Sequence, residues 1–586
     1  MQQDAANWRQ SGRVALSFQN SRHACFQAFA VAQKRRDAAR FFVLCSCCLS
    51  PFLLHAQTLP DAGSLLQPLE SNRPAALPKD ARKPTQTAPP ELLRSDGTQE
   101  VLVQSFSNQG NQMLSDAQVQ LLLKPYVGQK LSYLGLQQLT AKISQAYSDA
   151  GWVARVYLPE QDVTDGHIVI QIVEAIYGGA RLQGAEPVRL KMSEVLSRLD
   201  AQQSVGQPLN TKALDRALLL IQDLPGVNIN ASLQEGKDRA ETALILRMSD
   251  APRLIGEVTA DNSGARSTGS SRVALNVNLL SPAGQGDLAT GNLVHSEGSD
   301  YLRLAYSVPV GTDGWRVGVN VSGLQYRVLA PEFAALNAIG NTSGVGLEGT
   351  YPIIRSRQSN LYLQLNADDK HAHNESLGAV QSDYQIESYD ATLAGNQFDN
   401  GWGGGANSAS IGITSGSVVS NSDDPIPRNH PTGKFDRLHF ALSRQQTLTD
   451  KLSAYAAWTG QIMSNTLESS QKFYLGGPNG VRAFPVSEAG GSAGQMANLE
   501  LRYQLPSNLA LTGFYDWGEV TNDDRTASHT LHGFGLSLNW QTPWGQILKA
   551  TVARRGAANP NPTTTGTDQD GSYIEDRFWL SLTASF

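Results

Sequence analysis

Two stretches near the C-terminal end carry residues that could form a strong charged pair. The first, Phe473 to Pro485, is rich in glycine and contains Val481, Arg482, Ala483 and Phe484 in succession. The second runs from Phe514 to Gly518 and contains Asp516. A guanidinium can donate two parallel hydrogen bonds to one carboxylate, so Arg482 and Asp516 are complementary in geometry and charge. Because a long glycine-rich segment is entropically costly to order, we predict that this pair anchors it.

No arrangement of residues typical of catalysis or metal binding stands out. The histidines, among them His371, His373 and His439, lack the spacing with carboxylates that metal ligands show. We place His371 and His373 in a surface loop and expect both to be solvated. Glycines 403–405 indicate a turn rather than a phosphate-binding loop, because no helix follows them. We therefore expect a protein that is not an enzyme and that uses no cofactor and no metal ion.

Composition indicates a β-rich protein without a helical membrane span. The chain has 586 residues, with 53 glycines, 6 methionines and a net charge of −6. No long block of one charge sign is present, which argues against nucleic acid as a partner. Many glycines and few methionines favour turns and strands over helical bundles. No run of about 18 apolar residues exists, so a transmembrane helix is excluded.

Residues 1–56 are predicted to be a presequence with an export signal. Four basic residues between positions 34 and 40 precede the apolar stretch Phe41 to Leu54, and Ala56 offers a cleavage point. The segment before Lys34 is long for a signal peptide. Because the next methionine is Met113, a non-Met start near Val31 is a hypothesis. All four cysteines lie in this presequence, so the mature chain contains no thiol.

A linker and two small α/β units follow the presequence. Residues 57–99 are rich in proline, and we expect a short helix at 61–66 that Pro68 would shorten. Residues 100–178 and 179–252 each indicate one strand, two helices and two further strands, in the order β-α-α-β-β. The repetition of this order predicts two domains of the same kind.

The helices of the first unit have clear boundaries in the sequence. A strand is expected at 101–103. Ser115 and Gln118 form a capping box at the start of the first helix. The second helix begins near Ser132 and ends at Gly151, with an apolar face formed by residues three and four positions apart.

Short alternating segments recur from residue 253 to the C-terminus. The last ten residues, Arg577 to Phe586, alternate between apolar and mostly polar side chains and end on Phe586. This pattern is typical of the closing strand of an outer-membrane barrel. Glu500 and Arg502 lie at positions that alternate with apolar residues, so their side chains would face inward. Because the interior of a soluble sandwich must be dry, charged inward positions favour a barrel with a wet lumen and a lipid-facing exterior.

The predicted fold class is mainly β: an antiparallel outer-membrane β-barrel of about sixteen strands over residues 253–586, preceded by two periplasmic α/β domains. Short connections alternate with long polar loops, as in barrels whose two ends both lie in the periplasm. The long loops are expected at residues 324–342, 368–383, 415–434, 464–494 and 555–575.

These features resemble the two-partner secretion transporters (TpsB family) of the haemolysin-activator and filamentous-haemagglutinin type. In that family the sixth surface loop folds back into the barrel and carries a Val-Arg-Gly-Phe/Tyr tetrad, and an inner-wall strand carries Phe-x-Asp-x-Gly. The tetrad is matched by Val481, Arg482, Ala483 and Phe484, and the strand motif by Phe514, Asp516 and Gly518. Asp261 to Gly264 and Leu224 to Val227 are also similar to family segments.

Ala483 departs from the commonest form of the tetrad, which has glycine at this position. A positive φ would cost an alanine about 1 kcal/mol or more. We therefore expect an ordinary backbone conformation at Ala483.

The resemblance implies an outer-membrane translocator that recognises and exports, and thereby activates, a large partner exoprotein of haemolysin or haemagglutinin type. Its two α/β units would be periplasmic POTRA domains that capture the partner's N-terminal secretion domain. Residues 481–484 would form the gating loop and residues 514, 516 and 518 its partner on the barrel wall. Outer-membrane lipid would surround the barrel, and the barrel-assembly machinery would read Phe586 as the C-terminal signal.

Three alternatives remain open at this stage. An assembly or insertion factor of the same superfamily usually carries more POTRA units. An outer-membrane enzyme needs a nucleophile and a base on the barrel wall, which the sequence does not supply. A passive porin would not carry the α/β units. Whether the helix near residues 61–69 plugs the pore also remains open.

Overall fold

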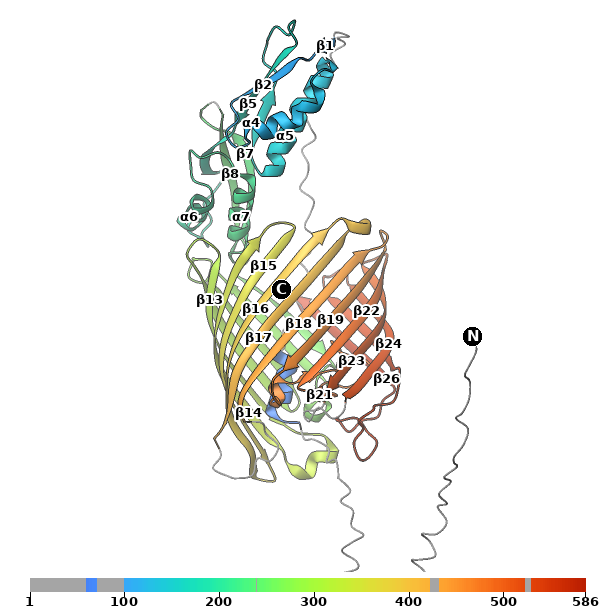
Figure 1. The fold of residues 1–586 in the computed structure, drawn as a ribbon. Helices are drawn as coiled ribbons and strands as arrows, with labels where there is room; N and C mark the ends of the chain where they lie inside the picture. The colour runs from blue at the N-terminus through green and yellow to red at the C-terminus, as the bar shows by residue number, and fades with distance from the viewer. Residues whose placement is uncertain (1–59, 71–99, 239, 422–431, 522–527) are drawn as a thin grey trace, which may run out of the picture. The chain divides into compact units, whose positions relative to one another are not determined.

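The computed structural model describes residues 60–70, 100–238, 240–421, 432–521 and 528–586 of the chain. The predicted presequence and most of the linker 57–99 lie outside the described residues, as do the hypotheses on the start and cleavage sites. Among the described helices, none combines the length and the apolar character needed to cross a membrane. Strand and helix labels below are those of Figure 1.

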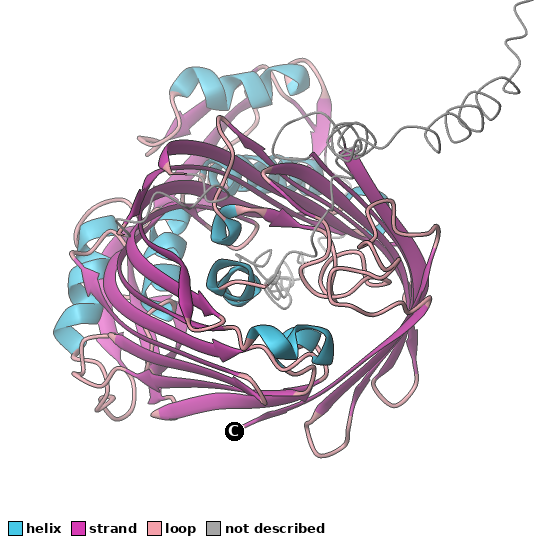
Figure 2. Cartoon of the chain, turned by 90° about the horizontal axis from the view of Figure 1, so that it is seen from below, coloured by secondary structure: helices cyan, strands magenta, loops and turns pink. Residues whose placement is uncertain are grey.

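Sixteen antiparallel strands close into a barrel, which confirms the predicted fold class (Figures 1 and 2). Each strand pairs with its neighbours in the barrel, and β26 returns to pair with β9. In chain order the strands are β9 Leu254–Asp261, β10 Arg272–Leu280, β11 Leu288–Ser296, β12 Ser299–Val310, β13 Trp315–Arg327, β14 Ile339–Arg355, β15 Ser359–Ser376, β16 Ala379–Asp399, β17 Gly405–Ser420, β18 Gly433–Thr447, β19 Leu452–Met463, β22 Ala493–Leu505, β23 Leu509–Thr521, β24 Ser528–Gln541, β25 Ile547–Arg555 and β26 Asp576–Ser585.

Alternation along β22 shows why these segments form a barrel rather than a soluble sandwich. Leu499 and Leu501 point outward and are 52% and 55% exposed, whereas the Glu500 side chain between them is 12% exposed inside the barrel. Successive residues of a strand face opposite sides, so one strand supplies both an apolar exterior and a polar lumen. A lipid bilayer would cover the exposed leucines.

The seam that closes the barrel is short. Strands β26 and β9 share five residue pairs, whereas β9–β10 and β25–β26 share eight each. Beyond the last pair, the side chain of Asn262 accepts a hydrogen bond from Leu580 N (2.8 Å) and donates one to Phe578 O (2.9 Å). At the opposite end, Phe586 and Gly256 exchange two backbone hydrogen bonds. A side chain therefore extends the seam where the strand pairing stops.

The short connections lie on the side of the barrel that contacts the second α/β unit. Arg355, the last residue of β14, forms an ion pair with Asp223 (2.7 Å), and Pro352 O of the same strand accepts a hydrogen bond from Arg216 (3.0 Å). Ser281, in the turn after β10, donates to Arg189 O (2.7 Å). The long loops therefore lie at the opposite end, as the sequence predicted.

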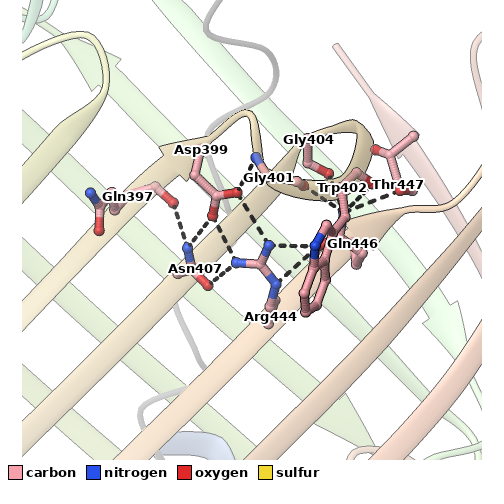
Figure 3. A network of polar contacts seen from close by, with 9 residues as sticks. All are labelled: Gln397, Asp399, Gly401, Trp402, Gly404, Asn407, Arg444, Gln446 and Thr447. Carbon is pink, nitrogen blue, oxygen red and sulfur yellow. Dashed lines mark hydrogen bonds and ion pairs between the residues drawn. The ribbon is translucent and has the colours of Figure 1, made fainter.

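The turn between β16 and β17 is held by a network of polar side chains (Figure 3). Gln446 donates hydrogen bonds to Gly401 O, Trp402 O and Gly404 O at 3.0–3.1 Å. Arg444 bonds both Asp399 (2.7 Å) and Asn407 (2.6 Å), which joins the ends of the two strands. The prediction that the glycines here form a turn is confirmed, since Gly403 and Gly404 have φ of 97° and 103°.

The first α/β unit contains β1 Glu100–Leu102, β2 Ser105–Gln109, α4 Asp116–Leu123, η2 Lys124–Tyr126, β3 Lys130–Ser132, α5 Tyr133–Ala150, β4 Ala154–Tyr157 and β5 His167–Glu174. The predicted capping box is present, with Ser115 and Gln118 bonding each other's backbone N–H. Helix α5 buries the predicted apolar face and ends at Gly151, which has a φ of 92°.

One strand of the main sheet was missed from the sequence. The strand expected at 101–103 is present as β1, which pairs with β3 in a separate two-stranded sheet, but β2 was not predicted. The three-stranded sheet has the order β2-β5-β4, with β2 parallel to β5. Because Phe106 is the single apolar residue of β2, this edge strand has no recognisable alternation.

The second α/β unit repeats the order of the first, as predicted. It contains β6 Ile176–Leu182, α6 Met192–Gln202, α7 Thr211–Gln222, β7 Val227–Glu235 and β8 Glu241–Asp250. Its sheet has the order β6-β8-β7, and the two helices pack on one face through a core that includes Tyr177, Leu199, Ile221 and Leu246.

Helix α3 (Ala62–Glu70) lies in the barrel lumen, where it is the blue helix of Figure 1. Ala62 N donates to Asn374 of β15 (2.9 Å), and Glu70 forms an ion pair with Lys370. The helix continues beyond Pro68, so the expectation that this proline would shorten it is wrong. Proline removes the N–H that would bond Ser64 O, and Ser487 Oγ donates to that carbonyl instead (3.3 Å).

The predicted loop 368–383 is a strand hairpin rather than a loop. Strands β15 and β16 continue through it and are joined by a turn at residues 377–378. Its polar sequence hid the strands, because a hairpin that projects beyond the bilayer needs no apolar face. His371 and His373 both contact Asp383, at 2.9 and 2.8 Å. The described residues contain no group of three His, Cys, Asp or Glu side chains placed to hold a metal ion.

Candidate functional site at the folded-back loop

The site is built on the connection between β19 and β22, residues 464–492, which is the sixth of the long-side connections and is called the sixth loop below. It contains η6 Ser469–Gln471 and a small ribbon of β20 Phe473–Tyr474 and β21 Gly490–Gly491. Viewed from the end of the long loops, loops and short helices lie inside the ring of strands (Figure 2). The tip of the sixth loop is buried: Val481 and Ala483 are fully inaccessible.

Arg482 and Asp516 are brought together in the forked geometry that their chemistry suggested. Arg482 donates from Nε to Asp516 Oδ2 (2.8 Å) and from Nη2 to Oδ1 (2.7 Å). Its backbone N–H also bonds Oδ2 (3.0 Å). Asp516 is fully buried and Arg482 is 5% exposed, so neither charge can be satisfied by bulk water. Removing one partner of such a pair costs about 3–5 kcal/mol.

Further groups complete the environment of this pair. The third nitrogen of the Arg482 guanidinium, Nη1, donates to Glu500 on β22 (2.9 Å). The face of the guanidinium lies 3.5 Å from the centre of the Phe514 ring, a cation–π contact. Asn498 donates to Asp516 Oδ1 (2.8 Å), and Trp579 Nε1 on β26 donates to Arg482 O (2.8 Å). The loop is therefore tied to three barrel strands through one arginine.

Three of these partners were not assigned to the site from the sequence. Glu500 appeared only as an inward-facing residue, while Asn498 and Trp579 were not singled out as contacts. The alternation that places Trp579 on the inner face was visible, but Trp579 and Arg482 are 97 residues apart in the chain. A contact of that range leaves no trace in a single sequence.

The remaining members of the tetrad pack into an apolar cluster against the barrel wall. Val481, Ala483 and Phe484 contact a set of buried residues that includes Leu475, Phe514, Val520, Leu531 and Ala553. Ala483 is not among the described residues with positive φ, so its backbone is ordinary, as expected. Its Cβ faces Gly533 of β24, where a Cβ would lie 2.6 Å away. The absence of a side chain at Gly533 leaves space for the methyl group of Ala483.

Gly518 has a comparable role at the strand motif. A Cβ at Gly518 would lie 2.6 Å from Leu475 Cδ2, and Leu475 is fully buried in the sixth loop. We expect Gly518→Ala to displace the loop at an overpacking cost of about 1–3 kcal/mol and to reduce export several-fold. The double variant Gly518→Ala/Leu475→Val conserves volume and should export within about twofold of wild type. Equal defects in both variants, measured by secretion at matched barrel levels, would show that this contact is unimportant.

Phe586, the predicted C-terminal signal, lies at the end of the seam. Its ring is 58% exposed, and its backbone pairs with Gly256. The structure thus leaves the aromatic side chain accessible at the edge of the barrel.

Comparison with known proteins identifies the family. The family model described as "Haemolysin secretion/activation protein ShlB/FhaC/HecB" matches residues 240–540, more than half of the chain. The chain belongs to this family. A second model, "POTRA domain, ShlB-type", matches residues 101–175, the first α/β unit.

Members of the ShlB/FhaC/HecB family resemble the chain over most of its length. The Heme/hemopexin transporter protein HuxB of Haemophilus influenzae (strain 86-028NP) is 26% identical over 93% of this chain and 99% of HuxB. The Outer membrane transporter CdiB of Dickeya dadantii (strain 3937) is 24% identical over 72% of this chain and 74% of CdiB. The solved structure of CdiB from Escherichia coli has a TM-score of 0.66 at 19% identity, covering 85% of this chain and 93% of that one, and shows the shared fold.

Membership of the ShlB/FhaC/HecB family makes the chain an outer-membrane two-partner secretion translocator, with its POTRA domains in the periplasm. Family members are transporters rather than enzymes, and they work with secreted exoprotein partners through their POTRA domains. This decides between the secretion and assembly-factor interpretations in favour of secretion.

Proposed function

We propose that this translocator exports one large partner exoprotein of haemolysin or haemagglutinin type and thereby activates it. The observation that carries the proposal is that the sixth loop is anchored to the barrel wall while α3 lies in the same lumen. A pore dedicated to one cargo protein needs internal elements that hold defined positions along its path. Arg482 bonds three acceptor oxygens on two barrel strands through side-chain nitrogens alone. We propose that Val481 to Phe484 form the gating segment and that Phe514, Asp516 and Gly518 hold it.

A second cargo class is favoured by one comparison. HuxB, which is named a heme/hemopexin transporter, aligns with 93% of this chain. An exported partner that handles heme or hemopexin is therefore the alternative cargo. Lysis of erythrocytes by the secreted product, or binding of hemopexin by it, distinguishes the two classes.

We propose that the first POTRA domain binds the partner's N-terminal secretion domain in an extended conformation. The end of α4, the turn after it and the start of α5 expose a set of large apolar side chains: Leu121, Leu122, Val127, Tyr133 and Leu134, between 37% and 71% accessible. Among the described residues, the short β1–β3 sheet beside them pairs with no further strand, so an extended chain can add to its edges. Exposed apolar side chains next to an open edge are what such a peptide requires.

The test is binding of the partner's secretion domain to the full-length translocator in detergent. We expect Leu121→Asp/Leu134→Asp to weaken binding about tenfold or more, because charges replace apolar contacts. Val188→Asp is the matched control, since Val188 is an 89% exposed apolar residue in the second unit. A deletion of residues 100–250 should abolish binding. Wild-type binding by the double variant would disprove this assignment of the surface.

We propose the domain limits inferred from the sequence, except that the second POTRA domain begins at Ile176, where β6 starts. The barrel then runs from residue 253 to 586.

Outer-membrane lipid is the proposed partner of the outward leucines. Trp402 and Trp544, which are 90% and 79% exposed in two turns on the periplasmic side, suit the interface between membrane and water. The barrel-assembly machinery is the proposed reader of Phe586. Removal of Phe586 should then lower the amount of heat-modifiable barrel.

A further inference from the structure

A second cluster of buried charges lies outside the Arg482 site, between the sixth loop and the connection between β25 and β26. That connection, residues 556–575, is called the eighth loop below. Glu488 of the sixth loop is 1% exposed, and Asp568 of the eighth loop is fully buried. Neither residue is used by the Arg482 network. Burying two carboxylates so completely costs free energy unless each is hydrogen-bonded or ion-paired. Specific partners must therefore stabilise both of them.

Asn559 joins the two carboxylates. Its side-chain amide donates to Glu488 Oε1 (2.8 Å) and to Asp568 Oδ1 (3.0 Å). The second oxygen of Glu488 accepts from the backbone N–H of Gln569 (2.9 Å). The second oxygen of Asp568 forms an ion pair with Arg555, at the end of β25. Each carboxylate is thus held by a group of the eighth loop or of the strand leading into it.

The cluster reaches the tetrad directly. The Arg555 guanidinium lies 4.5 Å from the centre of the Phe484 ring and 5.4 Å from that of Tyr573. Phe484 is 1% exposed, so the arginine covers the last residue of the tetrad from the long-loop side. The backbone carbonyl of Glu488 in turn accepts hydrogen bonds from Leu475 N and Gly476 N (both 3.1 Å), which closes the base of the loop tip.

The eighth loop has internal structure that positions these groups. Asp568 N donates to Ser572 O (2.7 Å) and Gly571 N donates to Asp568 O (2.9 Å), so Asp568 begins a tight turn. Thr563 and Thr567 form a second turn next to it. A loop that is ordered by its own turns can hold a neighbouring loop at lower entropic cost.

We propose that Glu488, Asn559, Arg555 and Asp568 form an outer clamp, a second anchor that holds the sixth loop in its working position from the extracellular side. The Arg482 network fixes the tip to the barrel wall, and the outer clamp fixes the returning arm to the eighth loop. These four residues are positioning residues for export. The inference rests on the proposed role of the sixth loop, and the eighth loop gains a function that is separate from contact with the cargo.

The test combines secretion with trypsin digestion of the outer-membrane protein. Arg482 is the only lysine or arginine between Lys472 and Arg502, so cleavage after it reports release of the loop tip. We expect Glu488→Gln and Asp568→Asn each to reduce export about tenfold or more and to accelerate cleavage at Arg482 by a similar factor. The control Asp570→Asn removes a carboxylate that accepts from Ser572 within the same loop and should match wild type in both assays.

Heat-modifiable mobility on a gel confirms that each barrel has folded. The two clamp variants change the contact from opposite loops, so the proposal can still be tested if one variant fails to fold. Unchanged export in both variants would overturn the outer clamp. Reduced export with Arg482 still protected would also overturn it, because the loss would not arise from displacement of the loop. Wild-type export by Arg482→Ala would instead disprove the proposed role of the sixth loop itself.

Discussion

Replacing Arg482 by alanine is expected to abolish export while leaving the barrel inserted. The variant leaves the carboxylates of Asp516 and Glu500 without the guanidinium that bridges them. Their side chains are only 0% and 12% exposed, so water cannot replace it. The cost is about 3–5 kcal/mol, which corresponds to a decrease by a factor of about 10² to several times 10³ in the population of the anchored loop. Secretion of the partner exoprotein, measured at equal amounts of heat-modifiable barrel, tests this expectation.

Arg502→Ala is the matched control for Arg482→Ala. Arg502 lies on β22 and forms an ion pair with Glu500 (2.7 Å), but its side chain is 34% exposed, and its other contacts are with Gln445 and Tyr455 on the barrel wall. Ion pairs that remain in contact with water contribute about 0–1 kcal/mol, so this variant should export within about twofold of wild type. If both arginine variants lost export equally, lumen charge rather than loop anchoring would be responsible.

Deleting residues 61–70 is expected to produce the largest change in pore conductance. Helix α3 contacts β13, β14, β15 and η6 inside the barrel, and a helix with its side chains is about 10–12 Å wide. Its removal should raise the conductance of the purified protein in planar bilayers several-fold. The point variant Glu70→Lys should act in the same direction, because it replaces the ion pair with Lys370 by repulsion.

Asp300→Lys supplies the control for this charge reversal. Asp300 lies on β12 beside Tyr301, whose hydroxyl donates to Glu70 (3.3 Å), but the Asp300 side chain is 65% exposed on the other face. Wild-type conductance is expected for this variant. A closed pore after deletion of α3 would mean that the sixth loop alone blocks the lumen.

Local patterns in the sequence predicted most of the fold. Alternation gave the barrel and its sixteen strands, because a lipid exterior and a wet lumen impose opposite polarity on successive residues. The capping box at Ser115 and the apolar face of α5 depend on neighbours three or four residues apart, which a sequence displays directly. Strand β2, with one apolar residue, and α3, which tolerates Pro68 because Ser487 bonds the freed carbonyl, depend on tertiary contacts instead.

The same distinction divides the candidate site. Arg482 and Asp516 were recognisable from motifs and complementary chemistry. Trp579, Asn559 and Asp568 were not, because their contacts with the sixth loop join segments that are 71 or more residues apart or act through a shared partner. Ala483 combines both cases: the departure from glycine is visible in the sequence, while the matching glycine at position 533 is not.

The five-pair seam between β9 and β26 has a consequence for assembly of the barrel. It joins segments more than 300 residues apart, as the hydrogen bond between Thr259 and Thr583 shows, whereas the other strand pairs form between near neighbours. Closing so long a chain segment is entropically the most demanding step, and few pairs reward it. We therefore expect a nascent barrel to pair its strands hairpin by hairpin and to close last at this seam. The side chain of Asn262 bonds both Leu580 N and Phe578 O and would stabilise the closed seam in this last step. On heating, the barrel should open first between β9 and β26.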